Sequence, residues 1–137
     1  MERLQELVEG FALFDDWEER YAYLIDLGKT LPGMDEALKT DERIVRGCTS
    51  RVWLDTTSSV NTGGKTVYHF TADSDAMIVR GLIAILMAAF NDCTGEEIAQ
   101  IDIEGAFNEM GLSTHLSPNR RNGFFAMVGR IKAETAA

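Results

Sequence analysis

The chain has 137 residues, 45% of them hydrophobic and 26% charged, which is the composition of an ordinary globular protein. Its 22 acidic residues outnumber its 13 Lys and Arg residues, and the net charge of -9 disfavours binding to nucleic acid or to anionic lipid. The most apolar run, residues 81–90, is shorter than the about 20 residues that span a bilayer, and the N-terminus lacks the pattern of a secretory signal. We therefore expect a single domain over residues 1–137, located in the cytoplasm and without a membrane partner.

Two helices are predicted at the N-terminus. Residues 2–14 and 17–27 both carry apolar side chains at spacings of three and four, the pattern of an amphipathic helix. Asp15 or Asp16 can cap the second helix, and Gly28 is placed to end it. The simplest interpretation is an antiparallel helix pair.

Strands are predicted in the middle of the chain, after a short helical turn at residues 34–40. Residues 43–47, 51–57 and 65–71 have strand character, and the last of these is the strongest. Residues 61–64, Asn-Thr-Gly-Gly, supply turn chemistry between the last two strands. The pattern predicts a small antiparallel sheet of three strands.

The longest predicted helix covers residues 75–91. Beyond Arg80 it has no polar face, so it should be the buried centre of the fold. Asp73 and Asp75 stand where helix caps and favourable charges at a helix N-terminus are found.

The remaining third of the chain is predicted to be helical. Thr94 to Glu97 is a capping signal for a short helix, and residues 102–110 form another. Residues 112–116 are expected to connect it to a last helix that starts near Asn119. The predicted fold class is α+β, with a three-stranded antiparallel sheet packed against helices.

Cys48 is the first candidate for chemistry. It follows Gly47, which permits a turn with positive φ, and it precedes the strand beginning at Arg51. Arg46 and Arg51 flank it, and nearby positive charge favours the reactive thiolate. Free cysteines are also commonly buried and inert, so the residues alone leave both interpretations open.

The second cysteine, Cys93, is expected to be buried at the end of the apolar helix. Two cysteines provide no disulfide framework and too few thiolates for a typical structural zinc site. His69 or His115 could pair with Cys48 in a thiol hydrolase, although no oxyanion-hole signature accompanies them. Asp73 and Asp75 are too short a cluster for a calcium loop.

Three blocks of sequence resemble the SufE family of sulfur-acceptor proteins, in that family's order and spacing. They are residues 44–54 (IVRGCTSRVWL), residues 73–82 (DSDAMIVRGL) and residues 116–123 (LSPNRRNG). The resemblance covers essentially the whole chain and implies the SufE/IscU-like fold.

The resemblance also implies a function. Cys48 would accept persulfide sulfur from a pyridoxal-phosphate (PLP) cysteine desulfurase of the SufS type, stimulate that enzyme, and deliver the sulfur to a SufBCD-like scaffold for iron-sulfur cluster assembly. PLP would belong to the desulfurase, and this chain would bind no cofactor or metal of its own. The family pattern assigns partner binding or positioning of the Cys48 loop to a set of nearby residues: Gly47, Ser50, Arg51, Asp75 and Arg120.

Residue chemistry alone treats two of these residues, Asp75 and Arg120, differently. Asp75 is explained by a charge at a helix N-terminus, whereas Arg120 in the first turn of a helix calls for a specific carboxylate or backbone partner. Other functions stay open: a CsdE-type acceptor for a CsdA-type desulfurase, an independent thiol enzyme (hydrolase or peroxidase) using Cys48, or a non-catalytic adaptor. The sequence is compatible with a monomer or a homodimer.

Overall fold

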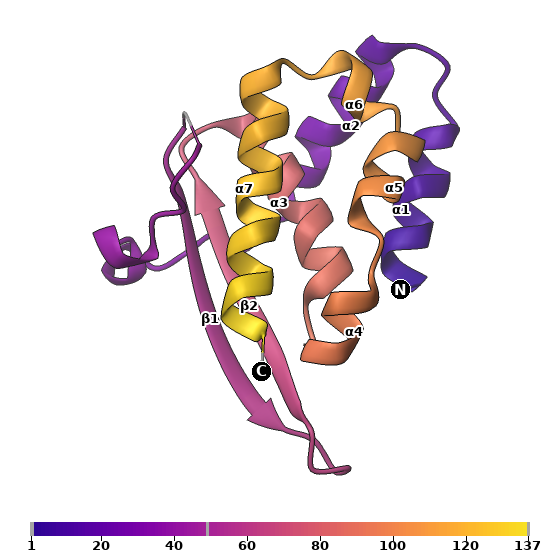
Figure 1. Cartoon of the computed structure of the whole chain (residues 1–137). Coiled ribbons are helices and arrows are strands. Elements are labelled where there is room, and N and C mark those ends of the chain that lie inside the picture. The colour runs from indigo at the N-terminus through magenta and orange to yellow at the C-terminus, as the bar shows by residue number, and fades with distance from the viewer. Residues whose placement is uncertain (1, 49, 137) are drawn as a thin grey trace.

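The computed structural model describes residues 2–48 and 50–136, and within these ranges it contains seven α-helices and three strands. Their order is α1 (Glu2–Ala12), α2 (Trp17–Lys29), the 3-10 turns η1 (Glu36–Leu38) and η2 (Asp41–Arg43), β1 (Val52–Val60), β2 (Thr66–Ser74), α3 (Met77–Phe90), β3 (Cys93–Thr94), α4 (Gly95–Gln100), α5 (Ile103–Glu109), α6 (Leu112–His115) and α7 (Pro118–Thr135). The helices gather on one side of the long β1–β2 hairpin, and the η1–η2 segment lies on the other (Figure 1). The predicted α+β class is confirmed. Among the described residues, no helix is long and apolar enough to cross a membrane.

The sheet has three antiparallel strands in the order β1-β2-β3, as predicted, but its third strand is not the expected one. β1 and β2 pair along their whole length, and β3 joins β2 at the other edge. The predicted strand at residues 43–47 is wrong: there only Ile44 forms a bridge, to Trp53, and Val45 N–H donates to the carbonyl of Val52. The chain coils into η2 up to Arg43, so it meets β1 over too few residues to form a ladder.

Helix α3 is the buried centre of the fold, as its apolar sequence predicted. Nine of its fourteen residues are buried. Gly28 does not end α2, which continues to Lys29; instead it lies in the contact with α3, where an added Cβ would be 2.8 Å from the backbone nitrogen of Gly81. The two glycines let the helices approach closely, which is a tertiary requirement that the local pattern did not reveal.

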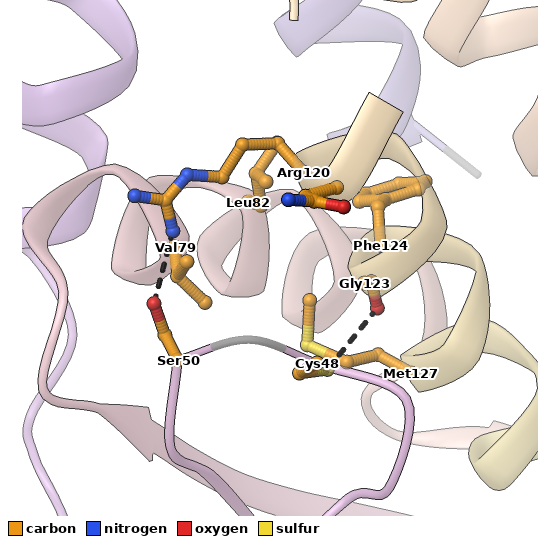
Figure 2. Close-up of a pocket in the computed structure, with 9 residues that line it drawn as sticks. Cys48, Ser50, Val79, Leu82, Arg120, Gly123, Phe124 and Met127 are labelled. Carbon is orange, nitrogen blue, oxygen red and sulfur yellow. Dashed lines mark hydrogen bonds between the residues drawn. The ribbon is translucent and has the colours of Figure 1, made fainter. Parts of the chain in front are cut away.

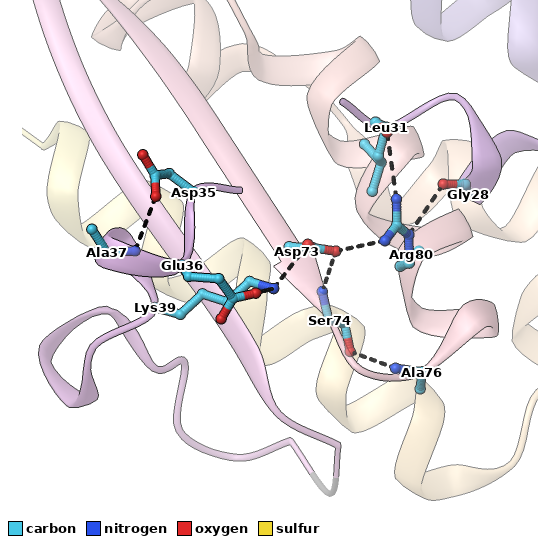
Figure 3. Close-up of polar contacts among 10 residues, drawn as sticks. All are labelled: Gly28, Leu31, Asp35, Glu36, Ala37, Lys39, Asp73, Ser74, Ala76 and Arg80. Carbon is cyan, nitrogen blue, oxygen red and sulfur yellow. Dashed lines mark hydrogen bonds and ion pairs between the residues drawn. The ribbon is translucent and has the colours of Figure 1, made fainter. Parts of the chain in front are cut away.

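The start of α3 differs from the prediction. The helix begins at Met77 and has no side-chain cap, so the capping role expected of Asp73 and Asp75 is wrong. Asp73 is 4% exposed and forms ion pairs with Arg80 (3.1 Å) and Lys39 (3.5 Å) (Figure 3). A buried carboxylate requires such partners, and these contacts join the end of β2 to the first turns of α3.

The C-terminal part follows the predicted signals closely. Thr94 and Glu97 form a complete capping box at α4, and Ser117 caps α7 ahead of Pro118. The predicted connector at residues 112–116 contains the one-turn helix α6. The predicted apolar stripe of α7 is buried: Phe124, Met127, Val128 and Ile131.

Candidate functional site

Cys48 lies in the loop between η2 and β1, next to Gly47 at φ +94°. Its side chain is half-buried, and the thiol donates a hydrogen bond to the carbonyl oxygen of Gly123 on α7, with a sulfur-to-oxygen distance of 3.5 Å. Figure 2 shows this hydrogen bond, with Cys48 facing Gly123 and the other residues that line a pocket between α3 and α7. The pocket there is lined, besides Cys48, by Ser50, Val79, Leu82, Asn119, Arg120, Gly123, Phe124 and Met127. The sulfur therefore faces a largely apolar wall, with polar groups on one side.

Burial raises the pKa of the Cys48 thiol. The prediction that Arg46 and Arg51 lower this pKa is wrong for the structure, in which both arginines are exposed. Desolvation disfavours the thiolate, and the apolar side chains of the pocket supply that desolvation. In this arrangement the thiol is stored in its protonated, weakly nucleophilic form.

We expect Cys48 in the isolated protein to be alkylated by iodoacetamide with a pH profile displaced above that of an unfolded cysteine. Because the folded-state pKa is raised, the thiol favours folding below the unfolded pKa, and this contribution is lost as the pH rises through the folded pKa. Alkylation of the Cys48 peptide, followed by mass spectrometry with and without urea, measures both profiles. Coincident profiles would show that the pocket does not shield the thiol.

Arg120 reaches across the pocket to the loop that carries Cys48 (Figure 2). Its Nη1 donates to the hydroxyl of Ser50 at 3.0 Å. The prediction that Arg120 binds a carboxylate or a backbone group is thus wrong, because its partner in the structure is the hydroxyl of a serine side chain. The contact connects the first turn of α7 to the residue two positions after Cys48.

Asp75 and Arg51 hold the far end of the same loop. The carboxylate of Asp75 accepts a hydrogen bond from the backbone N–H of Arg51 at 3.2 Å, and the backbone of Asp75 donates to the Arg51 carbonyl at 3.4 Å. The carboxylate is therefore engaged by the loop and not by the N-terminus of α3. Thr49, within the first resembling block, lies outside the described residues.

The structure brings together the six residues singled out from the sequence. Cys48, Ser50 and Arg120 line the pocket, Gly47 precedes Cys48 in the loop with a positive φ, and Arg51 and Asp75 are hydrogen-bonded to each other at the end of the loop. Sequence reasoning missed the apolar walls, which come from Val79 and Leu82 on α3 and from Phe124 and Met127 on α7. The α7 wall could have been found from the spacing of residues 120, 123, 124 and 127, which places these positions on one face of a helix.

The other reactive side chains lie elsewhere. Cys93 is buried in β3, as expected, and its thiol contacts the carbonyls of Ala89 and Asn91. His69 contacts Asp92 at 2.7 Å, and the ring of His115 stacks on Trp17. Neither histidine lines the pocket, so the described residues provide no Cys-His pair at Cys48. Nor does any group of three or more His, Cys, Asp or Glu residues in the described ranges form a metal site.

Fold and site together define a small α+β protein that presents one loop thiol in a pocket between two helices. Residues 5–135 match the SufE family, described as "Fe-S metabolism associated domain". An uncharacterised SufE-like protein of Rhizobium meliloti (strain 1021) is 44% identical over 134 residues, covering 98% of this chain and 95% of that protein. A second SufE-like protein, from Rhizobium etli, is 43% identical over 134 residues, covering 98% of this chain and 90% of that protein.

The fold has a close structural match as well. The solution structure of a hypothetical protein from Thermus thermophilus superposes with a TM-score of 0.73 at 18% identity, over 97% of this chain and 93% of that one. The chain belongs to the SufE family. Membership implies a sulfur-acceptor role in iron-sulfur metabolism and an interaction with a cysteine desulfurase.

Proposed function

We propose that Cys48 is the residue that accepts sulfur, as a persulfide, from a PLP-dependent cysteine desulfurase of the SufS type. The observation that carries the proposal is the position of its thiol, on a loop next to a positive-φ glycine and against an apolar pocket. The Cys48 thiolate attacks the terminal sulfur of the desulfurase persulfide, the S–S bond breaks, and the desulfurase cysteine leaves as a thiolate. Sulfur transfer of this kind is redox-neutral and requires no oxidant.

The resting position of Cys48 suits storage better than attack. Its thiol is half-buried, donates to Gly123 and has a raised pKa, so it must leave the pocket to react. We propose that the loop moves outward when the desulfurase binds and withdraws once loaded, which would shield the persulfide from reductant. Arg120–Ser50 and Asp75–Arg51 are charge-assisted hydrogen bonds that hold the loop, each contributing about 1.5–3 kcal/mol, so contacts with the desulfurase would have to replace those that the motion breaks.

Within this proposal Gly47, Ser50, Arg51, Asp75 and Arg120 bind the partner or position the loop. PLP stays on the desulfurase, and a SufBCD-like scaffold receives the sulfur for cluster assembly. A CsdA-type desulfurase would be served by the same chemistry. The adaptor alternative requires function without the Cys48 thiol, and the thiol-enzyme alternative requires activity without any partner.

Intact-mass spectrometry tests the acceptor role. After incubation with a SufS-type desulfurase, PLP and cysteine, we expect the protein to gain one sulfur atom that dithiothreitol removes. Cys48→Ser should gain none, whereas Cys93→Ser, which removes the buried thiol, should gain the same sulfur as the wild type. Sulfur retained by Cys48→Ser would move the site to Cys93, and no sulfur on the wild type would contradict the proposal.

A further inference from the structure

Arg130 links helix α7 to the segment that leads into the Cys48 loop. Its Nη1 donates to the carbonyl of Ile44 and its Nη2 to the carbonyl of Glu42, both at 3.0 Å, while its Nε donates to Glu134 at 3.0 Å. The two carbonyls lie more than 80 positions away in the sequence. A guanidinium can make these three contacts at once because its donors form a rigid planar fork.

This contact lies next to the backbone contacts between the segment before Cys48 and strand β1, and near the ion pair of Arg43 with Asp55 on the same strand. Ile44 forms its isolated bridge with Trp53, and Val45 donates to the carbonyl of Val52. Glu134, the third partner of Arg130, also accepts a hydrogen bond from the hydroxyl of Thr56 on β1. Arg130 and Glu134 therefore join three elements: the segment before Cys48, the strand after it, and α7.

Helix α7 is also the helix against which Cys48 rests. Gly123 accepts the thiol hydrogen bond, and Phe124 and Met127 line the pocket. Arg120, at the start of the same helix, holds Ser50. Arg130 thus completes a series of attachments along α7, before, at and after Cys48. The side chains of Arg130 and Glu134 are 29% and 30% exposed, so their pairing is partly shielded from water.

We propose that Arg130 is a positioning residue for Cys48: by holding the carbonyls of Glu42 and Ile44 on α7, it sets where the loop begins and so seats the thiol in the pocket. Its relevance to sulfur transfer rests on the proposed function, but the positioning itself does not. Without the arginine, the segment before the loop loses its attachment to α7 at Glu42 and Ile44 and keeps its contacts with β1, namely the Ile44–Trp53 bridge, the Val45–Val52 hydrogen bond and the Arg43–Asp55 ion pair. The loop should then leave the pocket more often.

The variant Arg130→Met tests this, because it keeps a long helix-compatible side chain and removes all three donors. The probe is iodoacetamide, and the readout is the pH profile of Cys48 alkylation at a temperature where both proteins are folded. We expect the Arg130→Met profile to shift to lower pH, with the rate at neutral pH rising by roughly three- to tenfold, since one unit of pKa changes the thiolate fraction about tenfold. Arg130→Lys, which keeps the charge without the planar fork, should fall between the two.

Lys132→Met is the matched control, because it removes an exposed cation from the same helix. It should leave the profile unchanged. A profile of Arg130→Met that coincides with the wild type, even with a lower melting temperature, would overturn the proposal and leave Arg130 a purely structural residue. The alkylation assay contains no desulfurase, so its result is independent of the mass-spectrometric test. If the wild-type protein accepts no sulfur from the desulfurase, the proposed function is refuted, whereas the alkylation profiles still decide the role of Arg130.

Discussion

Replacing Cys48 with Ser should abolish the stimulation of a SufS-type desulfurase by this protein. An acceptor accelerates the desulfurase by removing sulfur from its persulfide, and a hydroxyl at position 48 cannot form a persulfide. Sulfide production from cysteine, measured with dithiothreitol present and with increasing acceptor concentration, should fall to the rate of the desulfurase alone. The loss should be complete and should not be overcome at high concentration of the variant.

Two comparisons make this prediction specific. Cys93→Ser should stimulate like the wild type, because Cys93 is buried in β3 and lies outside the pocket. Cys48→Ser should still compete with the wild type for the desulfurase, since the contacts of Ser50, Arg51 and Asp75 remain. Full stimulation by Cys48→Ser would favour the adaptor function, and sulfur chemistry by the wild type without a desulfurase would favour an independent thiol enzyme.

The position of the reactive loop could be predicted because its signals are local. Gly47 adopts the positive φ that glycine permits, and the strand after Cys48 forms as its β-branched and aromatic residues indicated. The caps of the C-terminal helices were predictable for the same reason: Thr94 and Glu97 satisfy each other within one turn. Such features depend on residues a few positions apart, so a single sequence contains them.

The predictions that were wrong concern features that depend on residues far apart in the chain. Asp73 looked like a helix cap, but Lys39 and Arg80 surround it in the folded protein. The flanking arginines suggested an acidic thiol, whereas the walls contributed by α3 and α7 raise the pKa of Cys48. Likewise, Ile44 carries strand character, yet its carbonyl is bound by Arg130 and not by a neighbouring strand. The loop position of Cys48 follows from residues next to it in the sequence, whereas its burial and its raised pKa follow from the packing of α3 and α7.

The close contact between α2 and α3 gives the largest expected effect on stability. Gly81 is buried in α3, and a Cβ at this position would overlap the backbone carbonyl of Leu24, which a side-chain rotation cannot relieve. Gly81→Ala must therefore separate the two helices and disturb the contact at Gly28. We expect a loss of about 3 kcal/mol in the free energy of unfolding, at the upper end for overpacked cores. The melting temperature should fall by about 10 °C.

Gly129→Ala is the matched control for this prediction. Gly129 is exposed on α7, and an added Cβ there would have no heavy atom within 4 Å. Alanine favours the helix over glycine, so this variant should gain about 0.5–1 kcal/mol. Chemical denaturation followed by circular dichroism compares both variants with the wild type. Equal stabilities for Gly81→Ala and Gly129→Ala would contradict the close helix contact.

Because Val79 and Leu82 line the Cys48 pocket from α3, the same displacement by Gly81→Ala should also increase Cys48 alkylation.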